Sequence, residues 1–157
     1  MDYLFVKWVH VLSSTILFGA GVGSAFHMFV ATLRRQVPGI ATATRTVVVA
    51  DWLLTTPTAV LQPVTGLWLV AQAGLPWSTP WIAWSLGLYG VAIACWLPVV
   101  VIQIRMRNLA ADALAKGAPL PAAYDRLFHA WMALGFAAFF AFLFIFWLMV
   151  AKQLPWD

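Results

Sequence analysis

The chain has 157 residues, a length typical of one domain. Apolar residues make up 64% of the sequence and charged residues 9%, whereas soluble domains have about 45–50% and about 25%. This composition excludes a water-soluble globule, a disordered chain and collagen, and the single cysteine, Cys95, excludes a disulfide scaffold. The net charge of +4 does not indicate a nucleic-acid partner, because the basic residues lie between apolar runs. The sequence predicts an integral membrane protein whose first partner is the lipid bilayer.

Four apolar stretches are long enough to cross a bilayer, which requires about 20 residues each. They are residues 4–33, 47–73, 80–104 and 122–151. Short connections rich in proline and glycine separate them, and Thr79 before Pro80 is typical of an N-cap followed by proline at the first helical position. We therefore expect one all-α domain over residues 1–157, a four-helix transmembrane bundle with up-down topology.

The basic residues predict the orientation of the bundle. Seven of them flank the first and third connections: Arg34, Arg35, Arg45, Arg105, Arg107, Lys116 and Arg126. Only Lys7 and Lys152 lie near the opposite face. The positive-inside rule then places both termini outside, in a multi-pass protein of the bacterial inner (cytoplasmic) membrane. The first stretch follows acidic Asp2 and has no basic n-region, so we expect it to remain as a helix rather than be cleaved as a signal peptide.

Polar residues follow one face of the second stretch at helical spacing. They are Asp51, Thr55, Thr58, Gln62, Thr65 and Gln72. Comparable lines run along the first stretch (Lys7, His10, Ser14, Leu17, Gly21, Ser24, Met28) and the third (Ser85, Tyr89, Ala92, Trp96, Val99, Gln103). These faces should point into the bundle, where they either hold helices together or form a site. Pro57 and Pro63 should leave the carbonyls near Leu53 and Ala59 open to other donors.

Ionisable residues inside a span are costly and therefore indicate function. His10 lies about 10 Å inside the outer boundary, counted at about 1.5 Å per residue from Leu4. Its imidazole can ligate a metal or haem iron, relay a proton, or hydrogen-bond a neighbour. Tyr89, Thr65 and Gln62 lie at the same depth on other stretches.

A second group lies nearer the inner face. His27, Asp51 and His129 share a similar depth on three stretches, so they form a candidate metal site or mark a second haem. Two structural alternatives stand beside this hypothesis. Asp51 pairs with an arginine of the first connection, such as Arg45 or Arg34, and His129 bonds Asp125, four residues before it.

Several motifs resemble a bacterial family of four-helix membrane proteins known as domain of unknown function 2269. They are Lys7-Trp8-Val9-His10, residues 50–57, residues 62–68, residues 95–99, residues 103–107 and residues 146–152. The likeness covers nearly the whole chain and implies the same four-helix fold, but no activity.

The first stretch is also distantly similar to that of the HemJ-type protoporphyrinogen oxidases, which are four-helix b-haem proteins. Lys7 and His10 keep their Lys-x-x-His spacing, and Gly19-Ala20-Gly21 keeps a step of small residues. The resemblance implies that His10 is a haem-ligand candidate. The HemJ-type third helix carries a lysine thought important for its haem, and residues 80–104 contain no lysine here, which argues against protoporphyrinogen oxidation.

The leading hypothesis is a small membrane protein that binds haem b with His10 as an axial ligand. It would transfer electrons to or from a membrane-soluble partner or oxidise an apolar membrane-soluble substrate. Tyr89, Gln62 and Thr65 would surround the cofactor, and Met149 or Tyr89 is a candidate sixth ligand of an otherwise five-coordinate iron. A quinone, a porphyrin-like molecule, a second copy of the chain and a larger membrane complex are candidate partners. The alternative is a non-redox transporter or accessory subunit that uses the polar face from Asp51 to Gln72.

Overall fold

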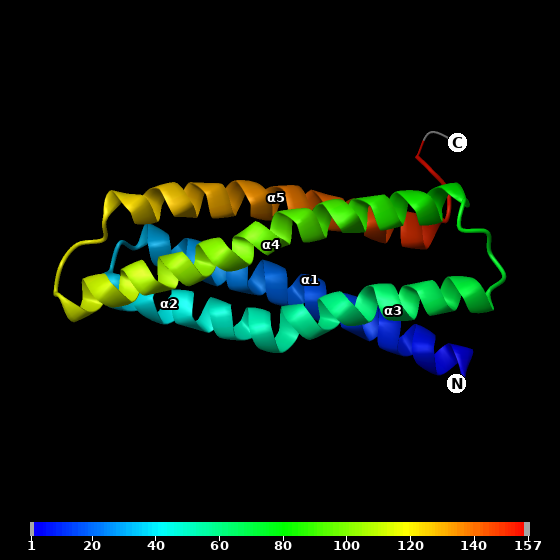
Figure 1. The fold of residues 1–157 in the computed structure, drawn as a ribbon, viewed down its shortest axis with the longest axis horizontal. Coiled ribbons are helices and arrows are strands. Elements are labelled where there is room, and N and C mark those ends of the chain that lie inside the picture. The colour runs from blue at the N-terminus through cyan, green and yellow to red at the C-terminus, as the bar shows by residue number, and fades with distance from the viewer. Residues whose placement is uncertain (1, 156–157) are drawn as a thin grey trace.

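The structure, a computed structural model, describes residues 2–155, and these residues contain helices but no strand. The elements in chain order are α1 (Tyr3–Leu33), α2 (Val37–Ala50), the π-helical turn η1 (Asp51–Thr55), α3 (Thr56–Gln72), α4 (Pro80–Ala115) and α5 (Ala122–Ala151). Because α2, η1 and α3 join end to end, residues 2–155 form four rods (Figure 1). Each rod is long and apolar enough to cross a membrane, which confirms the predicted all-α fold with four spans.

The rods run alternately up and down, and both ends of the chain lie at the same end of the bundle (Figure 1). α4 packs along α5 and also against α2, while α1 packs against α2 and α3. α1 and α5 touch each other much less than the other neighbouring rods do. The bundle is therefore loosely closed between its first and last helices, and α3 packs just as loosely against α4.

Two helices extend beyond the predicted spans. The second rod begins at Val37 rather than at residue 47, with Pro38 in its first turn, and α4 continues to Ala115 rather than ending at residue 104. Proline is well tolerated at a helix start because the first N–H groups have no intrahelical partner. The alanine- and leucine-rich end of α4 favours helix outside the hydrocarbon layer as well. The helices of the second and third rods are thus longer than the spans predicted for them.

Two prolines shape the second rod. Pro57 lacks an N–H, and its ring would clash with the carbonyl of Leu53 in a regular helix. The chain widens at η1, where the Thr56 N–H bonds the Asp51 carbonyl and the Thr56 hydroxyl donates to the same oxygen at 2.9 Å. Pro63 leaves the Ala59 carbonyl open, and the Tyr89 hydroxyl of α4 donates to it. The predicted acceptor near Ala59 is therefore confirmed.

The core lies toward the end of the bundle away from the termini. Its buried residues are Met28, Ile40, Val47, Met106, Ala110, Tyr124, Phe128 and Trp131. Tyr124 is fully buried, and its hydroxyl lies 3.0 Å from the Thr32 hydroxyl. This hydrogen bond joins α5 to α1 on the otherwise loose side of the bundle. At the chain surface nearby, the Arg35 guanidinium forms a salt bridge of 2.6 Å with Asp125.

Replacing Tyr124 with phenylalanine should lower the free energy of unfolding by about 1 kcal/mol, because the Thr32 hydroxyl loses its interhelical partner. Unfolding in mixed micelles of increasing dodecyl sulfate content would measure this change. Tyr3→Phe is the matched control, since Tyr3 is 40% exposed and its ring lies against Trp68. Equal stabilities of the two variants would show that the Tyr124–Thr32 bond contributes nothing.

Candidate functional site

His10 lies where α1 packs on α3. Its Nδ1 is 2.8 Å from the Thr65 hydroxyl, and its backbone carbonyl accepts a hydrogen bond of 2.8 Å from the Gln62 amide. The same amide donates to the Ser13 hydroxyl, and Ser13 in turn donates to the His10 carbonyl at 3.1 Å. The structure thus brings three of the predicted residues, His10, Gln62 and Thr65, into one network.

The Thr65 hydroxyl determines which imidazole nitrogen carries the proton. It donates to the Leu61 carbonyl at 2.7 Å, so its hydrogen is already used within α3. A hydroxyl whose hydrogen is used in this way accepts from His10, and this pairing corresponds to the tautomer that carries its proton on Nδ1. This leaves Nε2 of the neutral ring with its lone pair available. A histidine that donates one N–H to an orienting partner is the usual form of a metal-ligating histidine.

Gly66 makes room for the ring. A Cβ added at Gly66 would lie 3.1 Å from Cε1 of His10, closer than a side chain normally approaches. Glycine at this position therefore lets the imidazole lie directly against the α3 backbone. Thr65 thus orients the His10 ring through Nδ1, and the lack of a side chain at Gly66 leaves the space that the ring occupies.

The other two residues predicted around His10 are engaged or placed elsewhere. The Tyr89 hydroxyl donates to the Ala59 carbonyl, about one helical turn before Gln62 in α3. Met149 lies near the end of α5 with 39% of its surface exposed, and within residues 2–155 it forms no hydrogen bond with His10. Neither residue is joined to the His10 network.

Asp51 occupies a second polar centre, nearer the middle of the second rod. Its two carboxylate oxygens accept from the Trp96 indole at 3.1 Å and from the Gln103 amide at 2.7 Å. No arginine or lysine among residues 2–155 forms a salt bridge with it, so the predicted pairing with Arg45 or Arg34 is wrong. The extra residue of the π turn alters the helical phase at η1, and Asp51 lies on the side of α4 rather than at the first connection.

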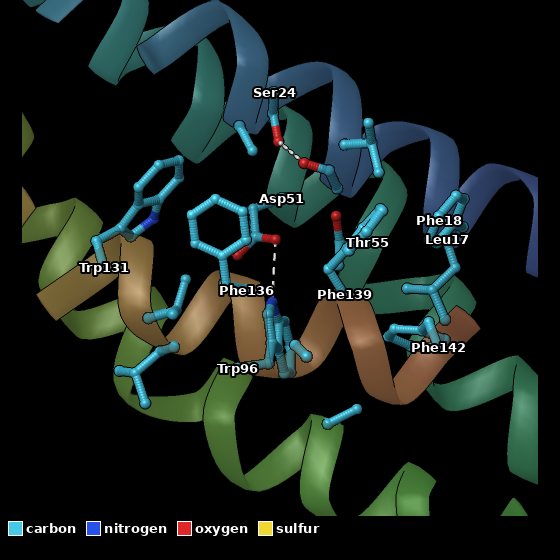
Figure 2. A pocket seen from close by; sticks show the side chains of 18 of the residues that line it. Leu17, Phe18, Ser24, Asp51, Thr55, Trp96, Trp131, Phe136, Phe139 and Phe142 are labelled. Atoms are coloured by element: carbon cyan, nitrogen blue, oxygen red, sulfur yellow. Dashed lines mark hydrogen bonds between the residues drawn. The ribbon is translucent and has the colours of Figure 1, made fainter. Parts of the chain in front are cut away.

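A cavity of about 500 Å³ adjoins Asp51, between α1, η1, α4 and α5. Figure 2 shows Asp51 and Thr55 on one wall, with its dashed line to Trp96, and the phenylalanines of α5 around the space. Its lining includes Phe18, Phe139 and Phe142 but not His10; the nearest lining residue of α1 is Leu17. The His10 network and this cavity are therefore two separate centres at different depths.

The three residues of the candidate metal site point to different surroundings. His27 is exposed and lines another cavity, of about 450 Å³, with Arg34 and Thr42. His129 is exposed, and its Nδ1 donates to the Asp125 carbonyl at 2.7 Å, as the structural alternative anticipated for this pair. In the part of the chain from 2 to 155, no group of three or more His, Cys, Asp or Glu residues is placed to hold a metal ion. The metal site predicted from His27, Asp51 and His129 thus remains a prediction that these contacts do not support.

Two participants were not assigned to a site from the sequence. Ser13, rather than Ser14, faces α3, because its hydroxyl accepts from the Gln62 amide, whereas Ser14 bonds the Val11 carbonyl of its own helix. Trp131 is 5% exposed and lines the cavity, and its indole N–H has no hydrogen-bond partner among residues 2–155. A tryptophan in an aromatic-rich span gives no sequence signal that separates packing from ligand binding.

The whole chain was compared with protein families, curated proteins and solved structures. No curated protein and no solved structure matches it. The model of one family, described as predicted integral membrane protein (DUF2269), matches residues 4–153. That match includes all four spans, the His10 network and the Asp51 centre. The chain therefore belongs to the DUF2269 family of integral membrane proteins.

Proposed function

We propose that this protein binds haem b in the bacterial inner membrane, with Nε2 of His10 as an axial ligand. The observation that carries the proposal is the hydrogen-bond chain from His10 Nδ1 through the Thr65 hydroxyl to the Leu61 carbonyl. This chain orients the ring and is compatible with the tautomer whose Nε2 could bind iron.

Each neighbour of His10 has a role in this proposal. Thr65 holds the ring by accepting from Nδ1, Gly66 allows the close approach, and Gln62 fixes the backbone of α1 through the His10 carbonyl. A haem bound there would supply one-electron chemistry, and the apolar surroundings would exclude water from it. The remaining ligand position would be open, because Tyr89 is already bonded to Ala59.

An absorbance spectrum of the detergent-purified protein, oxidised and then reduced with dithionite, tests the proposal. We expect a Soret band and, after reduction, sharp α and β bands. The protein should be expressed with added haem precursor so that supply is not limiting. A featureless spectrum under these conditions would overturn the proposal.

The alternative, a non-redox transporter or accessory subunit, depends on the polar face of the second rod. Thr55, Thr58 and Thr65 of this face are buried, as predicted, while Gln72 is exposed. Thr58 donates to the Leu54 carbonyl, and Gln62 and Thr65 are used by the His10 network. Because these groups are already paired, the face supports helix packing better than a polar path, and we favour the haem proposal.

A further inference from the structure

The cavity beside Asp51 opens toward the bilayer. Several residues that line it are exposed at membrane depth, among them Phe26 at 69% and Phe136 at 55%. On α1 and α5 the lining includes Gly21 and Gly135, where even an added Cβ would meet nothing within 4 Å. The opening thus lies on the loose side of the bundle, between α1 and α5.

Aromatic contacts close the two ends of this opening. Toward the termini, Phe18 packs on Phe139 and Phe146 with ring centroids 5.5 and 5.2 Å apart. Toward the other end, Phe29 stacks on Phe128 at 6.3 Å. A molecule would therefore enter sideways, from the hydrocarbon layer, and not along the bundle axis from water.

Trp131 lines the cavity and carries a buried donor that residues 2–155 do not satisfy. Its side chain is 5% exposed, and within residues 2–155 its N–H has no acceptor. An unmade hydrogen bond in an apolar interior costs about 1–3 kcal/mol, so a buried donor of this kind requires an explanation. A lipid acyl chain in the cavity would supply no acceptor. The donor instead favours an occupant that carries a carbonyl or similar oxygen.

Asp51 of η1 adds an acceptor to the lining, on a different helix from Trp131 (Figure 2). Its oxygens already accept from Trp96 and Gln103, but a carboxylate has lone pairs for further donors. The remaining lining is mainly aromatic and aliphatic, and aromatic side chains stack well on flat rings. The cavity therefore offers one donor and one acceptor around a space suited to a flat apolar ring.

We propose that this cavity binds a membrane-dissolved molecule of the quinone class, with a ring oxygen accepting from Trp131 and the apolar tail leaving between Gly21 and Gly135. The cavity volume of about 500 Å³ lies within the range of about 300–1,000 Å³ usual for small-molecule sites. The Asp51 carboxylate would accept from the hydroxyl of the reduced form. The inference rests on the proposed redox function for its biological role, but the binding itself is independent of haem.

Retention of decylubiquinone by the protein in phosphatidylcholine nanodiscs tests the proposal, measured against nanodiscs without protein after solvent extraction. We expect saturable binding of about one molecule per chain. Trp131→Phe should weaken it about tenfold, as expected for loss of one hydrogen bond. Gly135→Leu should abolish it by filling the opening. Two control variants should leave quinone binding unchanged. Trp147→Phe changes an exposed tryptophan of α5. Gly87→Leu adds a side chain outside the cavity lining, at a position with open space around the added Cβ.

Three results would overturn the proposal. One is the absence of saturable binding, and another is equal retention of decylbenzene, which has the ring and tail but no carbonyl. The third is displacement of the quinone by a metal-free porphyrin that binds more tightly, which would assign the cavity to a porphyrin. The quinone assay does not depend on the Soret band of the protein, so failure of this inference and failure of the haem proposal can be told apart.

Discussion

His10→Ala should abolish the Soret band of the purified protein, because the substitution removes the imidazole that we propose as the iron ligand. Thr65→Val should act in the same direction but more weakly. It keeps the ring and removes the acceptor of the 2.8 Å bond to Nδ1, and the loss of such an orienting partner typically costs about 10–100-fold in affinity. Titration of haem into the protein purified without it would measure both changes.

The other two histidines provide matched controls. His27→Ala and His129→Ala remove imidazoles from exposed positions, where one lines a separate cavity and the other bonds its own helix. Both variants should keep the wild-type spectrum. An unchanged spectrum of His10→Ala would contradict the assignment, and loss of the band in His27→Ala or His129→Ala would move the ligand to that residue.

The four apolar segments and the inward direction of their polar faces could be predicted because the hydrocarbon layer constrains the residues of each segment separately. Apolar length gives the spans, and polar residues at helical spacing show which side avoids lipid. The inward direction of Thr55 and Thr65 followed from that spacing, and their burial agrees with it. The free carbonyl at Ala59 was equally predictable, since a proline always deprives the residue four positions earlier of its N–H donor.

Partners across helices could not be predicted in the same way. The partner of Asp51 depends on the π turn, which shifts the helical phase in the middle of a rod, and the residues flanking Pro57 do not specify that shift. The negative charge of Asp51 favoured an arginine as its partner. In the structure its partners are two neutral donors of α4, Trp96 and Gln103. The cavity depends on how loosely α1 and α5 close, which is a property of four packed helices and not of any one segment.

The Asp51 centre permits a second experiment with a large expected effect. Gln103→Leu should lower the free energy of unfolding by about 2 kcal/mol, because it leaves a carboxylate inside the bundle with Trp96 as its remaining donor. Gln103 is 2% exposed, so water cannot readily replace the lost amide. The dodecyl sulfate unfolding assay would measure the change, with Gln72→Leu as control because Gln72 is exposed at the end of α3.

The double variant Asp51→Leu with Gln103→Leu separates stability from function. The double variant has no buried carboxylate, so no acceptor is left without its donor. Its free energy of unfolding should therefore recover the loss of about 2 kcal/mol or exceed the wild-type value. An aspartate inside a span costs about 2.5–3.5 kcal/mol on insertion scales, and this cost would also disappear. Such a recovery would mean that Asp51 is not needed to hold the helices together and would favour its role at the cavity. If the double variant is less stable than Gln103→Leu alone, the carboxylate is a structural element of the bundle, and the cavity wall that it forms is a consequence of packing.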